Sequence, residues 1–187
     1  MQKSQYIEGD VNLQQIHLTE LPDFLSGMEV RGKFVCGHNQ LTSLKNAPAI
    51  VRGNFNCAEN QITSLEHIPK VVGGDYFIYA NRISILENIP DTVGNFHCFE
   101  NLLTNLIGAP TTVNGNFNCS RNQLTTLKGA PTTVNGEFYC SSNKLESLEG
   151  IPKVVTRDFY CNGNKGRKFT EEEIRAVCDV GGQVLVY

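Results

Sequence analysis

An asparagine recurs through this chain at a nearly constant interval, and the residues around it recur with it. The members of the series are Asn39, Asn60, Asn81, Asn101, Asn122, Asn143 and Asn164. Every step is 21 residues, except that Asn81 and Asn101 are 20 residues apart. A fixed period of this size is typical of a solenoid, in which each repeat buries its apolar edge by stacking on its neighbours. The sequence therefore predicts one elongated repeat domain.

Each repeat opens with an alternation of apolar and variable residues, which indicates a strand with one buried side. In one copy, Val51, Gly53, Phe55 and Cys57 are expected to point inward, and the residues between them outward. Asn60 follows at a turn, where its side-chain amide can bond neighbouring backbone groups. Repeated in every unit, these asparagines are expected to form a ladder along the solenoid.

The second half of most repeats contains a proline, as at Pro48, Pro69 and Pro90. Proline fixes its own φ angle and disfavours helix at the residue before it. The segment of about eight residues that remains before the next strand is too short for a full helix. We therefore expect one parallel β-sheet on the concave side of the solenoid and an extended, polyproline-like convex side.

The ends of the chain depart from the pattern, as terminal repeats of solenoids do because one side faces water. Residues 1–32 are predicted to be an N-terminal cap with a first degenerate repeat, and residues 33–164 the regular repeats. Residues 165–187 are predicted to be a C-terminal cap. In it, Thr170 and Glu173 can form the capping box of a short helix, and residues 184–186 can add a last strand. A separate binding helix is the alternative interpretation of this segment.

The run F-x-C-x-x-N-x-L-x-x-L at residues 117–127 resembles a leucine-rich repeat in which Phe and Cys replace strand leucines. Its short, proline-containing return resembles the bacterial repeats of type III secreted effectors, and the F-x-C variant is familiar in bacteriophage proteins. The resemblance covers residues 7 to about 164 and implies an α/β-class solenoid that is mostly β and irregular. The ubiquitin-ligase domain of those effectors needs far more chain than remains, so that activity is not expected.

Charge and hydropathy exclude several classes of function. The chain has 16 Lys and Arg against 19 Asp and Glu, so it lacks the basic footprint of a nucleic-acid-binding protein. It contains no apolar run of about 20 residues that could span a bilayer. Residues 1–10 lack the basic and apolar segments of a signal peptide. We expect a cytoplasmic protein, in the host cytoplasm if it is phage-encoded, with no nucleic-acid or membrane partner.

Six cysteines share one position of the repeat, and Leu13 and Ile78 fill it in two other units. The cysteines are Cys36, Cys57, Cys98, Cys119, Cys140 and Cys161. Because the position accepts Cys, Ile or Leu, it is interpreted as a core position that holds buried free thiols. Stacked strands lie about 4.8 Å apart, so neighbouring cysteines could in principle bridge or bind a metal. No C-x-x-C pair typical of zinc sites occurs, and no metal or other cofactor is expected.

No catalytic constellation stands out. The four histidines share no repeat position, and His97, which faces outward from a strand, lacks the partners of a nucleophile–base pair. Asp75, Glu137 and Asp158 share a position with asparagines and a lysine, which indicates a solvated surface row rather than a calcium ladder. The protein is therefore predicted not to be an enzyme.

Outward-facing aromatic residues are the candidate partner-binding site. They are Phe77, Tyr79, His97 and Phe99 on two adjacent expected strands, with Tyr139 and Tyr160 as a smaller pair. Exposed apolar patches commonly mark interaction sites, and aromatics are enriched at binding hot spots. The alternatives are ordinary cross-strand stabilisation of the sheet and a different packing of the third regular repeat. We expect a protein–protein interaction module that binds a partner of unknown identity on the concave β-face, such as a phage or bacterial protein that occupies or inhibits a host factor, and we favour a monomer. A structural or self-assembling role, as in a virion or scaffold, is the alternative.

Overall fold

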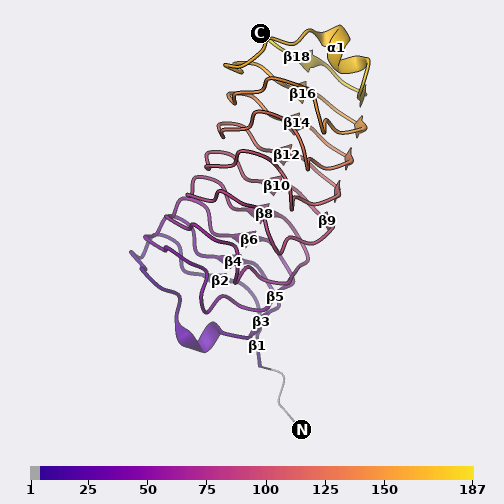
Figure 1. The fold of residues 1–187 in the computed structure, drawn as a ribbon. Helices are drawn as coiled ribbons and strands as arrows, with labels where there is room; N and C mark the ends of the chain where they lie inside the picture. The colour runs from indigo at the N-terminus through magenta and orange to yellow at the C-terminus, as the bar shows by residue number, and fades with distance from the viewer. Residues whose placement is uncertain (1–4) are drawn as a thin grey trace.

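The computed structural model describes residues 5–187 and shows a solenoid of short parallel strands (Figure 1). The chain winds through about nine turns, here called coils, with a repeat spacing of about 21 residues. Within residues 5–187, helix is confined to η1 (Asp23–Leu25) and α1 (Glu171–Arg175). A mostly β, parallel solenoid is therefore confirmed. Residues 1–4 of the predicted N-terminal cap lie outside the described part of the chain.

Each coil contributes one even-numbered strand to a nine-stranded parallel sheet. These strands are β2 (Val11–Asn12), β4 (Phe34–Val35), β6 (Phe55–Asn56), β8 (Tyr76–Phe77), β10 (Phe96–His97), β12 (Phe117–Asn118), β14 (Phe138–Tyr139), β16 (Phe159–Tyr160) and β18 (Val184–Leu185). Equivalent residues of successive repeats are paired, so that Phe96 stands opposite both Tyr76 and Phe117. Side chains at one repeat position therefore form rows that run along the solenoid.

The odd-numbered strands form two further sheets, where a single sheet was expected. One has four strands, β1 (Tyr6–Ile7), β3 (Glu29–Val30), β5 (Ile50–Val51) and β7 (Val71–Val72). The other has five, β9 (Thr92–Val93), β11 (Thr112–Val113), β13 (Thr133–Val134), β15 (Val154–Val155) and β17 (Asp179–Val180). Strands β7 and β9 are not paired, and the connection from β9 to β10 is the one shortened by a residue, with only Gly94 and Asn95 between them. Strand pairing along this side is therefore interrupted beside the shortened repeat.

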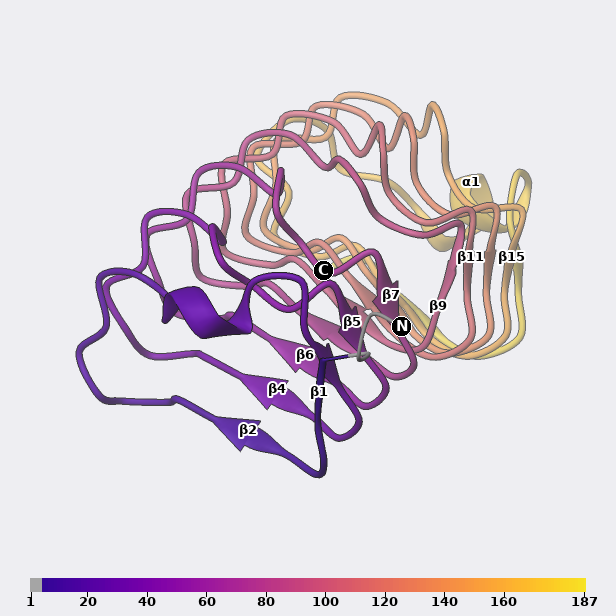
Figure 2. The same cartoon turned by 90° about the horizontal axis from the view of Figure 1, so that it is seen from below.

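The run from Val51 to Cys57, predicted as one strand, is two strands that meet at a corner. Figure 2 shows these corners stacked along the axis, each between an odd-numbered and an even-numbered strand. Gly53 lies at one of them, where a β-carbon would come within 2.9 Å of the Gly32 backbone in the previous coil. The alternation persists through the corner, because Val51, Phe55 and Cys57 are all fully buried. The inward positions were thus predicted correctly, although the shape of the chain between them was not.

A column of neighbouring aromatic rings fills the core behind the nine-stranded sheet. Its members are Phe34, Phe55, Tyr76, Phe96, Phe117, Phe138 and Phe159, all with 0% exposure. Neighbouring ring centroids lie between 5.0 and 6.4 Å apart. Tyr76 is the one tyrosine of the column, and its buried hydroxyl has no hydrogen-bond partner among the described residues.

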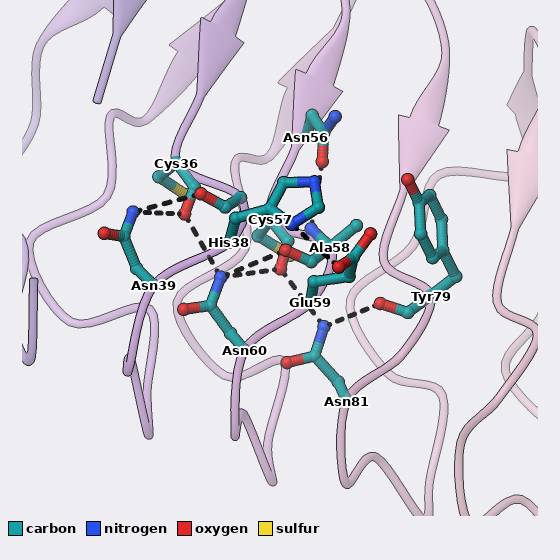
Figure 3. Close-up of polar contacts among 11 residues, drawn as sticks. Cys36, His38, Asn39, Asn56, Cys57, Ala58, Glu59, Asn60, Tyr79 and Asn81 are labelled. Carbon is teal, nitrogen blue, oxygen red and sulfur yellow. Dashed lines mark hydrogen bonds and ion pairs between the residues drawn. The ribbon is translucent and has the colours of Figure 1, made fainter. Parts of the chain in front are cut away.

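The predicted asparagine ladder is present, and Asn60 represents it (Figure 3). Its Nδ2 donates to the carbonyl oxygen of Cys57 and to that of Cys36 in the previous coil, both at 3.1 Å. Its Oδ1 accepts the backbone N–H of Leu41 at 2.9 Å. The two carbonyl bonds recur in every coil from Asn39 to Asn164. The ladder therefore satisfies backbone groups where the chain leaves the nine-stranded sheet.

The residue before each ladder asparagine has a left-handed backbone, which the sequence did not indicate. These residues are His38, Glu59, Ala80, Glu100, Arg121, Ser142 and Gly163, with φ between 50° and 69°. Glycine adopts this conformation without steric cost, whereas a residue with a β-carbon does not. Six of the seven positions therefore carry local strain.

The chain after residue 164 contains α1 and one further strand on each side of the solenoid. Thr170 Oγ1 accepts the N–H of Glu173 at 3.2 Å, and Glu173 Oε2 accepts the N–H of Thr170 at 3.0 Å, which is the predicted capping box. Residues 181–183, two of them glycines, connect β17 to β18. No helix within residues 5–187 is long and apolar enough to cross a membrane.

Candidate functional site

The six predicted site residues lie on the outward side of the nine-stranded sheet, and all six are half-buried. The register brings four of them together as one group, here called the aromatic cluster: Phe77, Tyr79, His97 and Phe99. The other two form the tyrosine pair, Tyr139 and Tyr160, on β14 and β16. Strand β12 lies between the two groups.

The aromatic cluster consists of two stacked pairs in contact with each other. Phe77 lies on His97, with 5.2 Å between ring centroids and 5° between ring planes. Tyr79 lies on Phe99, at 4.4 Å and 7°. His97 meets Phe99 edge to face, at 6.5 Å and 89°. The four rings therefore form one continuous surface in which each ring is held by a neighbour.

The tyrosine pair is stacked in the same way but is tied to acidic side chains. The ring centroids of Tyr139 and Tyr160 are 4.4 Å apart, with 8° between the planes. The Tyr139 hydroxyl donates to Glu137 at 2.5 Å, and the Tyr160 hydroxyl donates to Asp158 at 3.3 Å. Burial, together with the bond to Glu137, raises the pKa of Tyr139, so its hydroxyl stays protonated. This pair is therefore more polar than the aromatic cluster.

Polar and small residues separate the two groups and border the cluster. On β12 and just after it, Ser120 donates its backbone N–H to the Asn118 side chain at 3.0 Å. On the other side of the cluster, Ala58 donates to the Asn56 side chain at 2.9 Å. The sheet surface is thus polar on both flanks of the cluster, and the structure does not join the six residues into one patch.

The acidic row beside these rings has a structural role that sequence reasoning missed. Asp75 Oδ1 accepts the backbone N–H of Asn95 at 2.7 Å, and Asn54 Oδ1 accepts that of Asp75 at 3.1 Å. The same bond continues from Asn95 to Asn116 and from there to Glu137. The alternation of Asn and Asp at one position was the available signal, because both offer an oxygen at the same reach. Within residues 5–187, no group of three or more His, Cys, Asp or Glu is arranged to hold a metal ion.

The aromatic cluster is neutral at its centre. Burial lowers the pKa of His97 below its ordinary value, although the Asp75 carboxylate opposes the shift, so the imidazole is uncharged at neutral pH. Burial and then the Glu59 carboxylate raise the pKa of Tyr79. Glu59 is itself paired with His38, Oε2 to Nδ1 at 2.7 Å (Figure 3). An apolar centre beside charged groups is the usual anatomy of a protein-binding surface.

The return segments of two coils line an open hollow of about 380 Å³, between residues 107–111 and 128–132. Lys128 is its one titratable lining residue. The hollow lies outside the strands of the nine-stranded sheet, and none of the predicted site residues line it. The hollow therefore adds nothing to the aromatic cluster and offers no acid–base pair for catalysis.

Comparisons of the chain with models of protein families, with curated proteins and with solved structures found no match. They assign the chain to no family. A function for this protein must therefore be inferred from its own residues and their contacts.

Proposed function

We propose that this protein is a non-enzymatic binding module that holds a partner protein on the outward side of the nine-stranded sheet. The observation that carries the proposal is the aromatic cluster, in which four rings stack in pairs on neighbouring coils. Stacking restricts the rings before any partner arrives, so little side-chain entropy remains to be lost on binding. Rigid aromatic groups of this kind are typical hot-spot residues.

The surroundings of the cluster support a partner with an apolar contact group. His97 is neutral, and the flanking coils present the side chains of Asn56, Asn118 and Ser120 rather than further large side chains. A partner that inserts an apolar side chain would therefore find one apolar area within a polar sheet surface. The tyrosine pair, with its acidic neighbours Glu137 and Asp158, is proposed as a secondary contact suited to a hydrogen-bonding or basic group.

We further propose that the chain is a leucine-rich-repeat protein of the short, proline-containing bacterial or bacteriophage type. The recurring F-x-C-x-x-N-x-L pattern supports this class, since its Phe, Cys, Asn and Leu positions correspond to the core rows and the ladder. Residues 165–187 act as a C-terminal cap in this proposal, because Phe169, Ile174 and Cys178 are buried against the last coils. The module works in the cytoplasm, which is the host's cytoplasm if the protein is phage-encoded. There it binds a host or rival protein and occupies part of its surface.

Self-assembly is the second candidate, and the ends of the solenoid favour it. Strands β2 and β18 are the edges of the nine-stranded sheet, and edge strands can pair with another chain. Near the first coil, Phe24 is 68% exposed and Ile16 is 54% exposed. Sedimentation equilibrium across a wide concentration range tests this candidate: a constant monomer mass removes it, and growing mass supports it.

A capture experiment tests the binding proposal. The bait is the wild type, the triple variant Phe77→Ala/Tyr79→Ala/Phe99→Ala, or a control triple at exposed apolar residues elsewhere, Ile16→Ala/Phe24→Ala/Ile85→Ala. All three must first give the same circular dichroism spectrum and a cooperative melt. A protein captured from lysate is then purified, and its affinity for each bait is measured by calorimetry.

The expected result is a partner that binds the wild type and the control triple alike and loses at least about 100-fold in affinity for the cluster triple, as hot-spot truncations do. Equal affinity for all three baits would reject the aromatic cluster as the site. Loss with the control triple alone would move the site to the exposed apolar residues outside the sheet.

A further inference from the structure

The cysteine column ends in a small cavity at its C-terminal end. Cys161 lines a cavity of about 100 Å³ and is 4% exposed, whereas the five other cysteines of the column have 0% exposure. The remaining lining residues are Gly163, Asn164, Arg167, Lys168, Phe169, Val186 and Tyr187. A cavity needs roughly 10–15 Å³ of such volume to hold one water molecule, so this one can admit a small polar reagent. Cys161 is thus the one member of the column that a solute can approach without unfolding.

Cys161 also has a second thiol within reach. Strands β14 and β16 are paired in register, which places Cys140 opposite Cys161 on the next coil. The Cys140 thiol donates to the carbonyl oxygen of Tyr160, the residue before Cys161, at 3.4 Å. Neighbouring strands are separated by about 4.8 Å, which lies within the Cα separation that a disulfide accepts.

The two thiols differ in acidity because their surroundings differ. Hydrogen bonds from Cys140 and from Asn164, whose Nδ2 is 3.4 Å from the sulfur, lower the pKa of Cys161 against the effect of burial. Burial raises the pKa of Cys140. Arg167 and Lys168 also line the cavity, and Arg167 is paired with the carboxylate of Glu173. Cys161 is therefore the nucleophilic member of the pair.

We propose that Cys161 and Cys140 are a peroxide-sensitive dithiol, in which Cys161 is modified first and Cys140 then closes a disulfide between β14 and β16. The Cys161 thiolate attacks the terminal oxygen of a small hydroperoxide, the O–O bond breaks, and the alkoxide or hydroxide leaves with a proton. Cys161 then carries a sulfenic acid. The Cys140 sulfur attacks the Cys161 sulfur, the S–O bond breaks, and water leaves with the Cys140 proton. Two thiols are oxidised by two electrons, and the hydroperoxide is reduced to an alcohol or water.

The inner cysteines provide internal controls. Cys98 and Cys119 stand opposite each other in the same register as Cys140 and Cys161. Both are fully buried, with 0% exposure, and burial raises the pKa of both. Their oxidation requires local unfolding, which makes them slow. The proposal therefore requires that peroxide oxidise Cys140 and Cys161, at the C-terminal end of the column, faster than the inner cysteines.

The test treats the folded wild type with hydrogen peroxide at neutral pH, blocks remaining thiols with an alkylating reagent in denaturant, and maps the peptides by mass spectrometry. The expected product is a Cys140–Cys161 disulfide that forms at least about 10-fold faster than any modification of Cys98 or Cys119, which must wait for opening. In Cys140→Ser, dimedone is expected to trap a sulfenic acid on Cys161. The matched control Cys119→Ser keeps the disulfide and its rate.

Two results would overturn the proposal. One is oxidation that proceeds at similar rates at the inner pairs and at Cys140–Cys161, since this indicates reaction through unfolding. The other is a Cys161 that remains reduced while the protein stays folded and the peroxide is in excess. The wild-type rates decide the matter by themselves if Cys140→Ser fails to fold.

Discussion

The ring of Tyr79 lies flat on the ring of Phe99, with 4.4 Å between their centroids. The two residues occupy the same repeat position on neighbouring coils, so the stack runs along the solenoid axis, as do the rows of the core. The pair therefore acts on the protein in two ways: it holds two coils together, and it offers one face of each ring to the surface. Stability and binding measurements can separate these contributions.

A double-mutant cycle measures the first contribution. Tyr79→Ala and Phe99→Ala are expected to show a coupling free energy of about 0.5–1.5 kcal/mol in chemical denaturation, because stacked aromatic pairs contribute this much beyond their buried area. The control cycle pairs Tyr79→Ala with Tyr139→Ala, which share no contact and should be additive within about 0.5 kcal/mol. Additive effects for Tyr79 and Phe99 would mean that the stack adds nothing to stability.

Removal of the Tyr76 hydroxyl is expected to increase the stability of the folded protein. This hydroxyl is fully buried without a partner among the described residues, in a column whose other members are phenylalanine. Tyr76→Phe removes this unsatisfied group and is expected to raise the free energy of unfolding by about 1–3 kcal/mol. Tyr79→Phe, at the half-buried surface, is the matched control, with a change within about 0.5 kcal/mol. A Tyr76→Phe variant less stable than the wild type would contradict the finding that this hydroxyl is unpaired.

Removal of one side-chain amide from the asparagine ladder is expected to lower the stability of the protein strongly. Asn122 donates to the carbonyl oxygens of Cys98 and Cys119 and accepts the N–H of Leu103, all at 3.0–3.1 Å. Asn122→Ala leaves these buried backbone groups unpaired and is expected to cost about 3 kcal/mol or more in the free energy of unfolding. Asn135→Ala, at an exposed position, is the control and should change it by less than about 0.5 kcal/mol. Equal effects of the two substitutions would reject the structural role of the ladder.

Because the residue before each ladder asparagine has a left-handed backbone, a glycine at that position is expected to make the folded protein more stable. Ala80 has φ 50°, so Ala80→Gly relieves strain and is expected to stabilise the protein by about 1 kcal/mol. The same change at Ala176, with φ −67° at the end of α1, should instead destabilise it by a few tenths to about 1 kcal/mol. Differential scanning calorimetry of the two variants checks the opposite signs. A lower melting temperature for Ala80→Gly would show that its methyl group contributes more than the strain costs.

The pKa of His97 predicts a dependence of stability on pH. Burial lowers this pKa in the folded protein below the value of about 6.5 expected for an unfolded chain. Between the lowered pKa and pH 6.5, the unfolded state therefore binds more protons than the folded state. The contribution of His97 is complete above this window and is lost as the pH falls through it. Urea denaturation at several pH values should show a shallower decline for His97→Gln than for the wild type; identical declines would contradict the shift.

The repeat period allowed much of the fold to be predicted from the sequence. The rows of Phe, Cys and Leu and the ladder at Asn60 follow directly, because stacking in register places equivalent residues side by side. The corner at Gly53 was missed since alternation looks the same in one straight strand and in two strands that meet at a glycine. A glycine inside a strand pattern was the available signal for a bend. The second row of strands was missed for the same reason.

The candidate site was predictable in part. The pairing of Phe77 with His97 followed from the register, but the ring geometry and the half-buried state depend on side-chain packing that the sequence pattern does not encode. The left-handed positions gave no signal, because residues as different as Glu59 and Ala80 occupy them. The cavity at Cys161 was also invisible, since it arises where residues 163–169 and 186–187 come together.

Because strands β7 and β9 are not paired, the solenoid is expected to resist a pulling force least at this position. Strands β6, β8 and β10 remain paired across this region, so on the strand-bearing sides the two halves of the solenoid are joined through one sheet alone. A force applied to the two ends is therefore shared by fewer hydrogen bonds at this level than at any coil with both sheets intact. In a single-molecule pulling experiment, rupture is expected to begin here, and the chain should lengthen in two blocks rather than coil by coil.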